Sequence, residues 1–213
     1  MKGIIDPTEF KKELDDTKQF EGKGSQDSVG FLTILLDMLP CEASIFKGNF
    51  KSRISCVTCG WHSDKYDDFT VLTLPITGTD LNTMYKNFTS VEENVTYKCK
   101  KCMRNTIHTK KITVKKFPLR LIISLKRFTS KLTVIRSHVD FPVKQLVLDG
   151  IEYILYAIVE FQGSYKGGHY IVTVYNFEDD IWRVYNDSLV SDRIFQKEEF
   201  NETAYILFYE KLP

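Results

Sequence analysis

The spacing of apolar residues changes from a helical period to an alternating one near residue 45. Before that point, Phe10 and Leu14 lie about one helical turn apart after an Asp-Pro-Thr-Glu segment, which is typical of a helix start. A second run, from Phe31 to Leu39, is apolar over one broad face. The pattern therefore predicts helices over residues 6–16 and 26–39.

From residue 45 onward, apolar and polar residues alternate, which predicts strands. The alternation is seen at Phe50, Ser52 and Ile54, then at Phe69 and Val71, and later at Ile112 and Val114. A short helix is expected over residues 80–87. Further strands are predicted over residues 119–128, 131–135, 153–161, 169–175, 182–185 and 204–209. Because the helices come first and strands fill the remainder, we expect an α+β fold with an antiparallel sheet.

The composition narrows the class of protein. The chain has 213 residues, of which 43% are hydrophobic and 27% charged, and this excludes a disordered chain. Its 29 Lys and Arg residues against 28 Asp and Glu residues give a net charge of +1, which disfavours a general nucleic-acid binder. No run approaches the roughly 20 apolar residues of a membrane span, and the N-terminus lacks the apolar core of a secretory signal. We therefore expect a cytoplasmic or nuclear protein without a membrane partner.

Four of the five cysteines form two C-x-x-C pairs, Cys56 with Cys59 and Cys99 with Cys102. Two such pairs can complete a tetrahedral four-sulfur zinc site. Disulfides and unliganded thiols are the alternatives, and disulfides are disfavoured because nothing marks secretion. The spacing predicts a structural zinc ion that joins two distant hairpins. The remaining thiol, Cys41, is expected to be a small packed side chain.

The segment from Lys98 to Lys116 contains eight Lys or Arg residues in 19. A nucleic-acid surface is one interpretation of this basic run. The other is a solvated pair of strands whose edges are protected by lysine, and this second interpretation is favoured.

A predicted hairpin brings a histidine and an asparagine together. With its turn centred between Phe177 and Glu178, His169 lies directly opposite Asn186, on one face of the sheet. Asp187 is adjacent but points to the other face. A histidine oriented by an asparagine is the base half of a Cys-His-Asn triad. Taken alone, such a pair can equally be structural.

The order of these features is more specific than any one of them. The two C-x-x-C pairs, the LIISLKRF segment, the Gly-Gly-His-Tyr hairpin with its Trp and Asn-Asp return, and the final AYILFY strand together resemble the ubiquitin-specific protease family. The resemblance covers residues 6–212. It implies a papain-like fold with a partial helical thumb (residues 1–44), zinc-binding fingers (45–118) and a palm (119–213) that carries the hairpin.

The resemblance also implies roles for individual residues. His169 matches the general base, Asn186 the residue that orients it, and Asp187 an assisting acidic neighbour. Asp27 matches an acidic contact to the basic tail of ubiquitin. Gly167 and Gly168, which lack Cβ atoms where a Gly-Gly tail must pass, and Tyr170 are expected to line the tail channel; the alternative is that the two glycines only form a flexible turn before a strand. The implied partners are ubiquitin, or a ubiquitin-like modifier, and ubiquitinated proteins.

The sequence departs from the family in two places. The Asn-Thr-Cys-type box that carries the nucleophile is not found, because no cysteine precedes Cys41. In the segment matching Gln-Gln-Asp-Ala-x-Glu-Phe-Leu, Ser25 and Gly30 replace a glutamine and a glutamate. We therefore expect that this chain alone does not hydrolyse peptide or isopeptide bonds.

Three hypotheses follow. The first is a cysteine-type deubiquitinase, cleaving after the Gly-Gly end of ubiquitin, whose nucleophile lies outside this chain. The second is a catalytically inactive ubiquitin-binding scaffold, a pseudoenzyme, which the missing box favours. The third is an unrelated zinc-ribbon interaction module, which only the basic run supports.

Overall fold

The structure is a computed structural model that describes residues 6, 8–16, 27–39 and 41–213. The helices are α1 (Thr8–Asp16), α2 (Ser28–Met38) and α3 (Leu81–Thr89), with 3-10 turns η1 (Glu42–Phe46) and η2 (Lys197–Phe200). The strands are β1 (Gly48–Cys56), β2 (His62–Phe69), β3 (Val71–Pro75), β4 (Val91–Lys98), β5 (Asn105–Lys116), β6 (Arg120–Lys126), β7 (Leu146–Leu148), β8 (Ile151–Ser164), β9 (Gly167–Asn176), β10 (Ile181–Asn186), β11 (Leu189–Arg193) and β12 (Ala204–Lys211).

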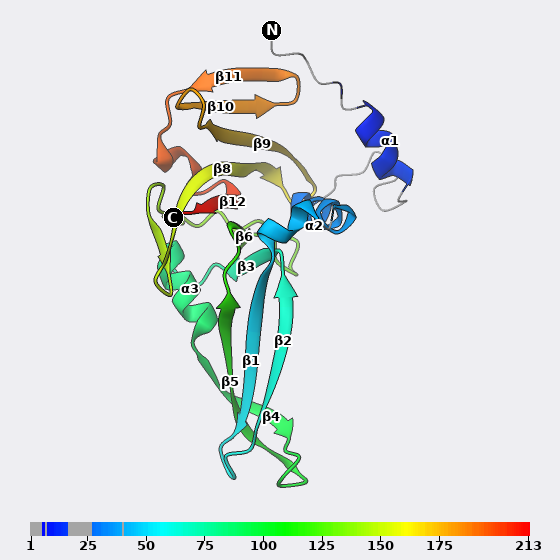
Figure 1. Cartoon of the computed structure of the whole chain (residues 1–213), viewed down its shortest axis with the longest axis vertical. Coiled ribbons are helices and arrows are strands. Elements are labelled where there is room, and N and C mark those ends of the chain that lie inside the picture. The colour runs from blue at the N-terminus through cyan, green and yellow to red at the C-terminus, as the bar shows by residue number, and fades with distance from the viewer. Residues whose placement is uncertain (1–5, 7, 17–26, 40) are drawn as a thin grey trace.

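These strands form two sheets (Figure 1). The finger sheet has the order β2-β1-β5-β4 and projects away from the rest of the molecule. The palm sheet has the order β11-β10-β9-β8-β12-β6-β3, with β7 paired to β8. The predicted α+β class is confirmed. One pairing, β3 with β6, is parallel. Between these two strands the chain leaves the palm sheet and passes through α3, β4 and β5 before it returns.

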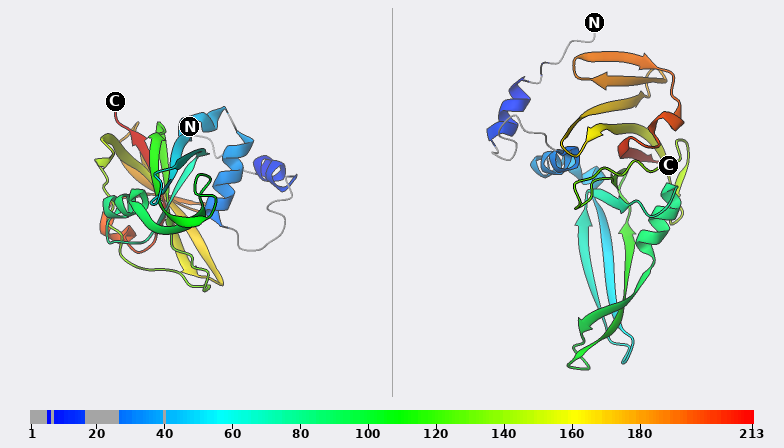
Figure 2. Two further views of the ribbon diagram at one scale, coloured as in Figure 1. Left: turned by 90° about the horizontal axis from the view of Figure 1, so that it is seen from below. Right: turned by 180° about the vertical axis from the view of Figure 1, so that it is seen from behind.

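The middle of the palm sheet has a core on each face, with α3 on one side and α2 on the other (Figure 2). Alternation along β6 shows the two faces: Leu121, Ile123 and Leu125 join a core with α3, whereas Ile122 joins a second core with α2 and η1. All four side chains are fully buried. Burial of one such side chain is worth about 1.5–3 kcal/mol, so the two cores fix where β8, β9 and α2 meet.

Side-chain caps set the starts of two helices. Asp27 has an extended backbone and accepts a hydrogen bond from the amide of Val29 at 3.3 Å. Asp80 accepts one from the amide of Thr83 at 2.9 Å. Because a cap satisfies an amide that has no partner inside the helix, α2 begins at Ser28. The predicted start of this helix at residue 26 lies outside the described residues.

One predicted strand is wrong and others were not predicted. Residues 131–135 form a turn closed between Thr129 and Thr133, with Leu132 at a positive φ of 59°, instead of a strand. The strand β4 and all of β2 except its last residue, Phe69, were not predicted because nearly all their side chains are exposed, so no apolar alternation marks them. The same holds for the exposed edge strand β11.

The path of the chain between the two cysteine pairs passes through both sheets. The strand β3 and the helix α3 lie between β2 and β4 in sequence but pack in the palm. Within the described residues, no helix is long and apolar enough to span a membrane.

Candidate functional site

The tip of the finger sheet gathers the two cysteine pairs. The Sγ atoms of Cys56, Cys59, Cys99 and Cys102 all lie within 4.8 Å of one another, and those of Cys59 and Cys99 are 3.6 Å apart. A tetrahedral zinc ion with Zn–S bonds of about 2.3 Å would set its sulfur atoms about 3.8 Å apart. The four thiols therefore fit a tetrahedral metal ion.

Backbone hydrogen bonds hold each pair in the same kind of turn. The amide of Gly60 donates to the carbonyl of Cys56 at 3.0 Å, and the amide of Met103 donates to the carbonyl of Cys99 at 2.9 Å. Both residues have a positive φ, 70° at Gly60 and 58° at Met103. The amide of Cys102 also points at the sulfur of Cys99, at 3.4 Å. The geometry of each turn thus aims two thiols at one point.

The charges of the cluster also favour a cation. A hydrogen bond with the Thr106 hydroxyl lowers the pKa of the Cys56 thiol to about 5. The neighbouring Cys59 thiol, together with burial, raises the pKa of Cys102 to about 12. Four thiols this close cannot all ionise without a positive charge among them. A divalent ion supplies that charge and allows all four to act as thiolate ligands.

A second site lies at the outer part of the palm sheet, where His169 in β9 meets Asn186 in β10. The two side chains are joined by a hydrogen bond of 2.6 Å between His169 Nε2 and Asn186 Oδ1. Because the amide oxygen only accepts, Nε2 carries the hydrogen and Nδ1 keeps a lone pair. The structure therefore brings the two residues together with the ring nitrogen Nδ1 available as a base.

The register of this hairpin differs from the predicted one. Ile181 pairs with Asn176 and Tyr185 with Val172, so the turn is centred between Glu178 and Asp179, and Asn186 is not directly opposite His169. The pairing is displaced by two residues, which leaves each side chain on its original face. His169 and Asn186 are consequently diagonal neighbours on one face, close enough for long polar side chains to touch.

Asp187 does not point away from His169, as the alternation predicted. It occupies the tight turn between β10 and β11 with a φ of 52°, which returns its side chain toward the ring. Asp187 Oδ2 lies 3.9 Å from His169 Nε2, and the carboxylate side chain is 83% exposed. At that exposure an ion pair contributes little, so Asn186 is the closer partner.

A groove of about 460 Å³ adjoins the histidine strand. Tyr170, the residue after His169, lines it, and Asp27 lines it from the start of α2. The other lining residues are Phe128, Phe161, Ser164, Tyr165 and Tyr205. The groove therefore combines an aromatic wall with a single carboxylate.

The carboxylate of Asp27 already accepts hydrogen bonds within the protein. Its Oδ1 atom accepts from the amide of Val29 and from the hydroxyl of Tyr205, at 3.3 and 2.8 Å. The Tyr170 hydroxyl also interacts with this carboxylate. Burial, with the nearby Asp27 charge, raises the pKa of Tyr170 and of Tyr205, so both hydroxyls remain protonated at neutral pH. Asp27 is thus the carboxylate that the groove offers to a cationic ligand.

The two glycines before His169 differ in their surroundings. A Cβ atom at Gly168 would lie 2.4 Å from the ring of Phe161, so this position must be glycine for the strands to pack. A Cβ atom at Gly167 would meet nothing within 4 Å. Space for a ligand beside the histidine strand is therefore open at Gly167, whereas Gly168 has a structural reason to lack a side chain.

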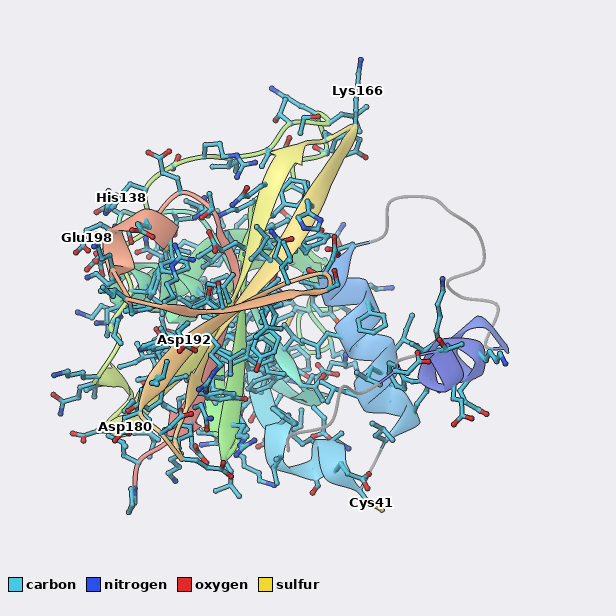
Figure 3. The ribbon with its side chains drawn as sticks, turned by 90° about the horizontal axis from the view of Figure 1, so that it is seen from above. Cys41, His138, Lys166, Asp180, Asp192 and Glu198 are labelled. Carbon is cyan, nitrogen blue, oxygen red and sulfur yellow. The ribbon has the colours of Figure 1, made fainter. Side chains whose placement is uncertain are left out.

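The fifth cysteine lies away from this site. Cys41 is exposed, so the expectation of a packed side chain is wrong; it follows the C-terminal end of α2, where no strand covers it. The groove is at the other end of that helix, whose 11 residues span about 16 Å. Figure 3 shows Cys41 on the side of the molecule remote from Lys166, at the tip of the β8–β9 hairpin.

Sequence reasoning missed most of the groove lining. Phe128 and Tyr205 belong to the LKRF and AYILFY segments, which the sequence marks as motifs without showing what they contact. Ser164 and Tyr165 lie beyond the strand predicted over residues 153–161. The groove arises where β6, β8, β12 and α2 converge, and no periodicity in one segment reports such a meeting.

Comparison with protein families gives one match across nearly the whole chain. The model of the family described as ubiquitin carboxyl-terminal hydrolase matches residues 1–209. Ubiquitin carboxyl-terminal hydrolase Usp2 of Drosophila melanogaster is 32% identical over 186 residues, covering 78% of this chain and 20% of that protein. Ubiquitin carboxyl-terminal hydrolase 21 of Rattus norvegicus is 34% identical over 187 residues, covering 78% of this chain and 33% of that protein.

Solved structures agree with this match. A chain of the SAGA DUB module of Ubp8, Sgf11, Sus1 and Sgf73 bound to monoubiquitin superposes with a TM-score of 0.81 at 26% identity, covering 94% of this chain and 51% of that chain. The same module bound to ubiquitin aldehyde gives a TM-score of 0.78 at 26% identity, covering 90% of this chain and 50% of that chain. This chain thus spans about half of those chains and from a fifth to a third of the two curated relatives named above.

Proposed function

The chain belongs to the ubiquitin carboxyl-terminal hydrolase family, and on this premise we propose that its groove holds the C-terminal tail of ubiquitin or of a ubiquitin-like modifier. The observation that carries the proposal is the groove beside His169. It pairs an aromatic wall with the carboxylate of Asp27, which suits a basic tail. The open side at Gly167 suits the two terminal glycines of that tail.

The second part of the proposal concerns chemistry. His169, with Nε2–H held by Asn186, presents Nδ1 as a general base. That base would remove the proton of a thiol, and the sulfur would attack the carbonyl carbon of the last glycine in the tail. The protonated ring would then return the proton to the leaving amine, and water would release the tail from the sulfur. Asn186 keeps the ring in the tautomer that this sequence requires.

We propose further that the thiol for this reaction comes from outside the 213 residues. Four of the five cysteines converge at the fingertip, and Cys41 lies at the opposite end of α2 from the groove. His169 therefore has no sulfur within reach among the described residues, and this chain alone should bind without cleaving. The same observation supports the alternative of a ubiquitin-binding scaffold, which shares the groove but uses no base.

Zinc is the metal that the fingertip suits best. Four cysteine ligands in a tetrahedral arrangement are typical of structural zinc, with no open position for catalysis. Bound there, the ion would tie the β1–β2 turn to the β4–β5 turn. Its proposed role is to hold the finger sheet, which has exposed side chains along most of β2 and β4, in one shape.

Titration of ubiquitin into the purified chain, by calorimetry or NMR, tests the groove. We expect a dissociation constant of about tens of micromolar, and Asp27→Asn should weaken it about ten- to a hundredfold, because a charge-assisted hydrogen bond is lost. Asparagine keeps both the helix cap and an acceptor for Tyr205, so the fold should persist. Asp37→Asn, an exposed carboxylate near the other end of α2, is the matched control. Equal binding by all three proteins would refute the tail-groove assignment.

A further inference from the structure

Two arginines in the segment between β6 and β7 bind backbone carbonyls in different parts of the palm. Arg127 is fully buried and donates to the carbonyls of Ala204 (2.6 Å), Asn201 (2.9 Å), Ile135 (3.0 Å) and Ser137 (3.0 Å). Burial lowers its pKa to about 10, and at neutral pH it stays charged. Because its donors reach residues on both sides of position 136, Arg127 fixes the backbone from which the second arginine extends.

The second arginine, Arg136, reaches across to β8. Its two terminal nitrogens donate to the carbonyls of Phe161 and Gly163, each at 2.7 Å. Its guanidinium also lies over the Phe161 ring, 5.6 Å from the centroid. A planar fork with two parallel donors matches two carbonyls that point the same way from alternate residues of one strand.

These carbonyls lie where β8 loses its neighbour. The last pair between β8 and β12 is Glu160 with Ala204, and the Phe161 amide still donates to Thr203 at 2.9 Å. Since the N–H and C=O groups of one strand residue point to the same side, the Phe161 carbonyl faces the space beyond the start of β12. Arg136 supplies donors on the side that β12 has left open.

The two residues whose carbonyls Arg136 binds, Phe161 and Gly163, lie beside His169. In the β8–β9 register, Phe161 lies opposite Tyr170 and Gly163 opposite Gly168, with His169 between them opposite Gln162. Gly163 has a φ of 139°, and a Cβ atom there would lie 2.4 Å from the Gly168 Cα atom. Near its tip, the β8–β9 hairpin has no side chains to hold the strands together at the Gly163–Gly168 pair. The shape of the tip therefore depends on contacts from other segments.

We propose that Arg136 is a positioning residue that holds the tip of the β8–β9 hairpin in place. Through the tip it also positions the groove wall and the strand that carries His169. Phe128 and Phe161 line the groove from the two segments that Arg136 joins, with ring centroids 4.9 Å apart. The consequence for ubiquitin rests on the proposed function. The clamp itself is a property of the free chain.

Amide hydrogen exchange on the free chain tests the clamp. In Arg136→Met, which keeps the length but removes all donors, amides of residues 161–169 should exchange about tenfold faster or more. Arg136→Lys keeps the charge but lacks the planar fork that matches both carbonyls, so its effect should be intermediate. Arg120→Met, which removes a half-buried arginine paired with Glu210 at the other end of β6, should leave these amides unchanged.

Two site-specific readouts separate positioning from general stability. The imidazole nitrogen spectrum of His169 should change in Arg136→Met, and ubiquitin affinity should fall about tenfold, while neither changes in Arg120→Met. Exchange at residues 161–169 equal to wild type would overturn the clamp. Faster exchange with an unchanged His169 spectrum and unchanged affinity would overturn the positioning role. Should the wild-type chain bind no ubiquitin, the proposed function fails, and the exchange and His169 spectra still decide the inference.

Discussion

The fingertip and the edge of the palm each bring polar side chains from separate segments to one point, and they differ in completeness. The fingertip holds four sulfurs from two turns 40 residues apart, a full set of ligands for a metal ion. The palm holds a histidine hydrogen-bonded to an asparagine, but no thiol among the described residues. A site of crowded thiolates needs its cation in order to fold, whereas a neutral His–Asn pair is stable without a reaction partner. The palm pair can therefore persist without a third group, whereas an incomplete set of metal ligands cannot.

Removing one metal ligand should have the largest effect. Structural zinc contributes about 10 kcal/mol or more to folding, so Cys99→Ser should lose the ion and unfold or aggregate the finger sheet. Wild-type protein should contain about one zinc ion per chain by elemental analysis, and Cys41→Ser should match it. Freshly purified, folded wild-type protein without zinc would contradict the four-sulfur assignment.

Removing the hydrogen bond between His169 and Asn186 should lower the stability of the chain much less. His169 is 44% exposed in its side chain, and one hydrogen bond contributes about 0.5–1.5 kcal/mol. Asn186→Ala should therefore lower the midpoint of thermal unfolding by about 2–4 °C. Asn105→Ala, an exposed asparagine at the start of β5, serves as the control. A loss of more than about 10 °C in Asn186→Ala would show that this pair is needed for the fold, and the contrast with the fingertip would fail.

The two fingertip turns differ in strain, which a smaller experiment resolves. Gly60 and Met103 occupy the same place in their turns, with φ of 70° and 58°, but only glycine adopts this region without a Cβ penalty. Met103→Gly should stabilise the zinc-bound chain by about 0.5–1 kcal/mol, and Gly60→Ala should destabilise it by about 1 kcal/mol. Denaturant midpoints in excess zinc measure both changes. Shifts of the same sign in the two variants would show that the turns are not equivalent.

The sequence predicted the features that depend on residue types at fixed spacing. The C-x-x-C pairs were expected to converge, and they do. The His169–Asn186 contact was expected from hairpin pairing, and it forms although the register is displaced by two residues, because such a displacement preserves the face. The predicted helices are confirmed within the described residues, because each was marked by apolar residues at helical spacing or by a capping residue at its start.

The rest depends on how distant segments meet. The turn of Asp187 toward His169 follows from a positive φ that alternation does not reveal. The groove needs Phe128 and Tyr205 to meet Asp27, and the clamp needs Arg136 to reach β8. Exposed strands such as β4 carry no apolar pattern, because the finger sheet projects from the palm and buries little.

The central claim, that this chain binds the tail of ubiquitin but has no thiol for the base to activate, is tested most directly with a ubiquitin probe. The probe carries an electrophile at its C-terminus and bonds only to a thiol placed beside the histidine. Intact-mass measurement on a sample that binds ubiquitin should show no adduct. An adduct of one ubiquitin per chain that His169→Ala or Cys41→Ser abolishes would contradict the account and place the nucleophile within these 213 residues.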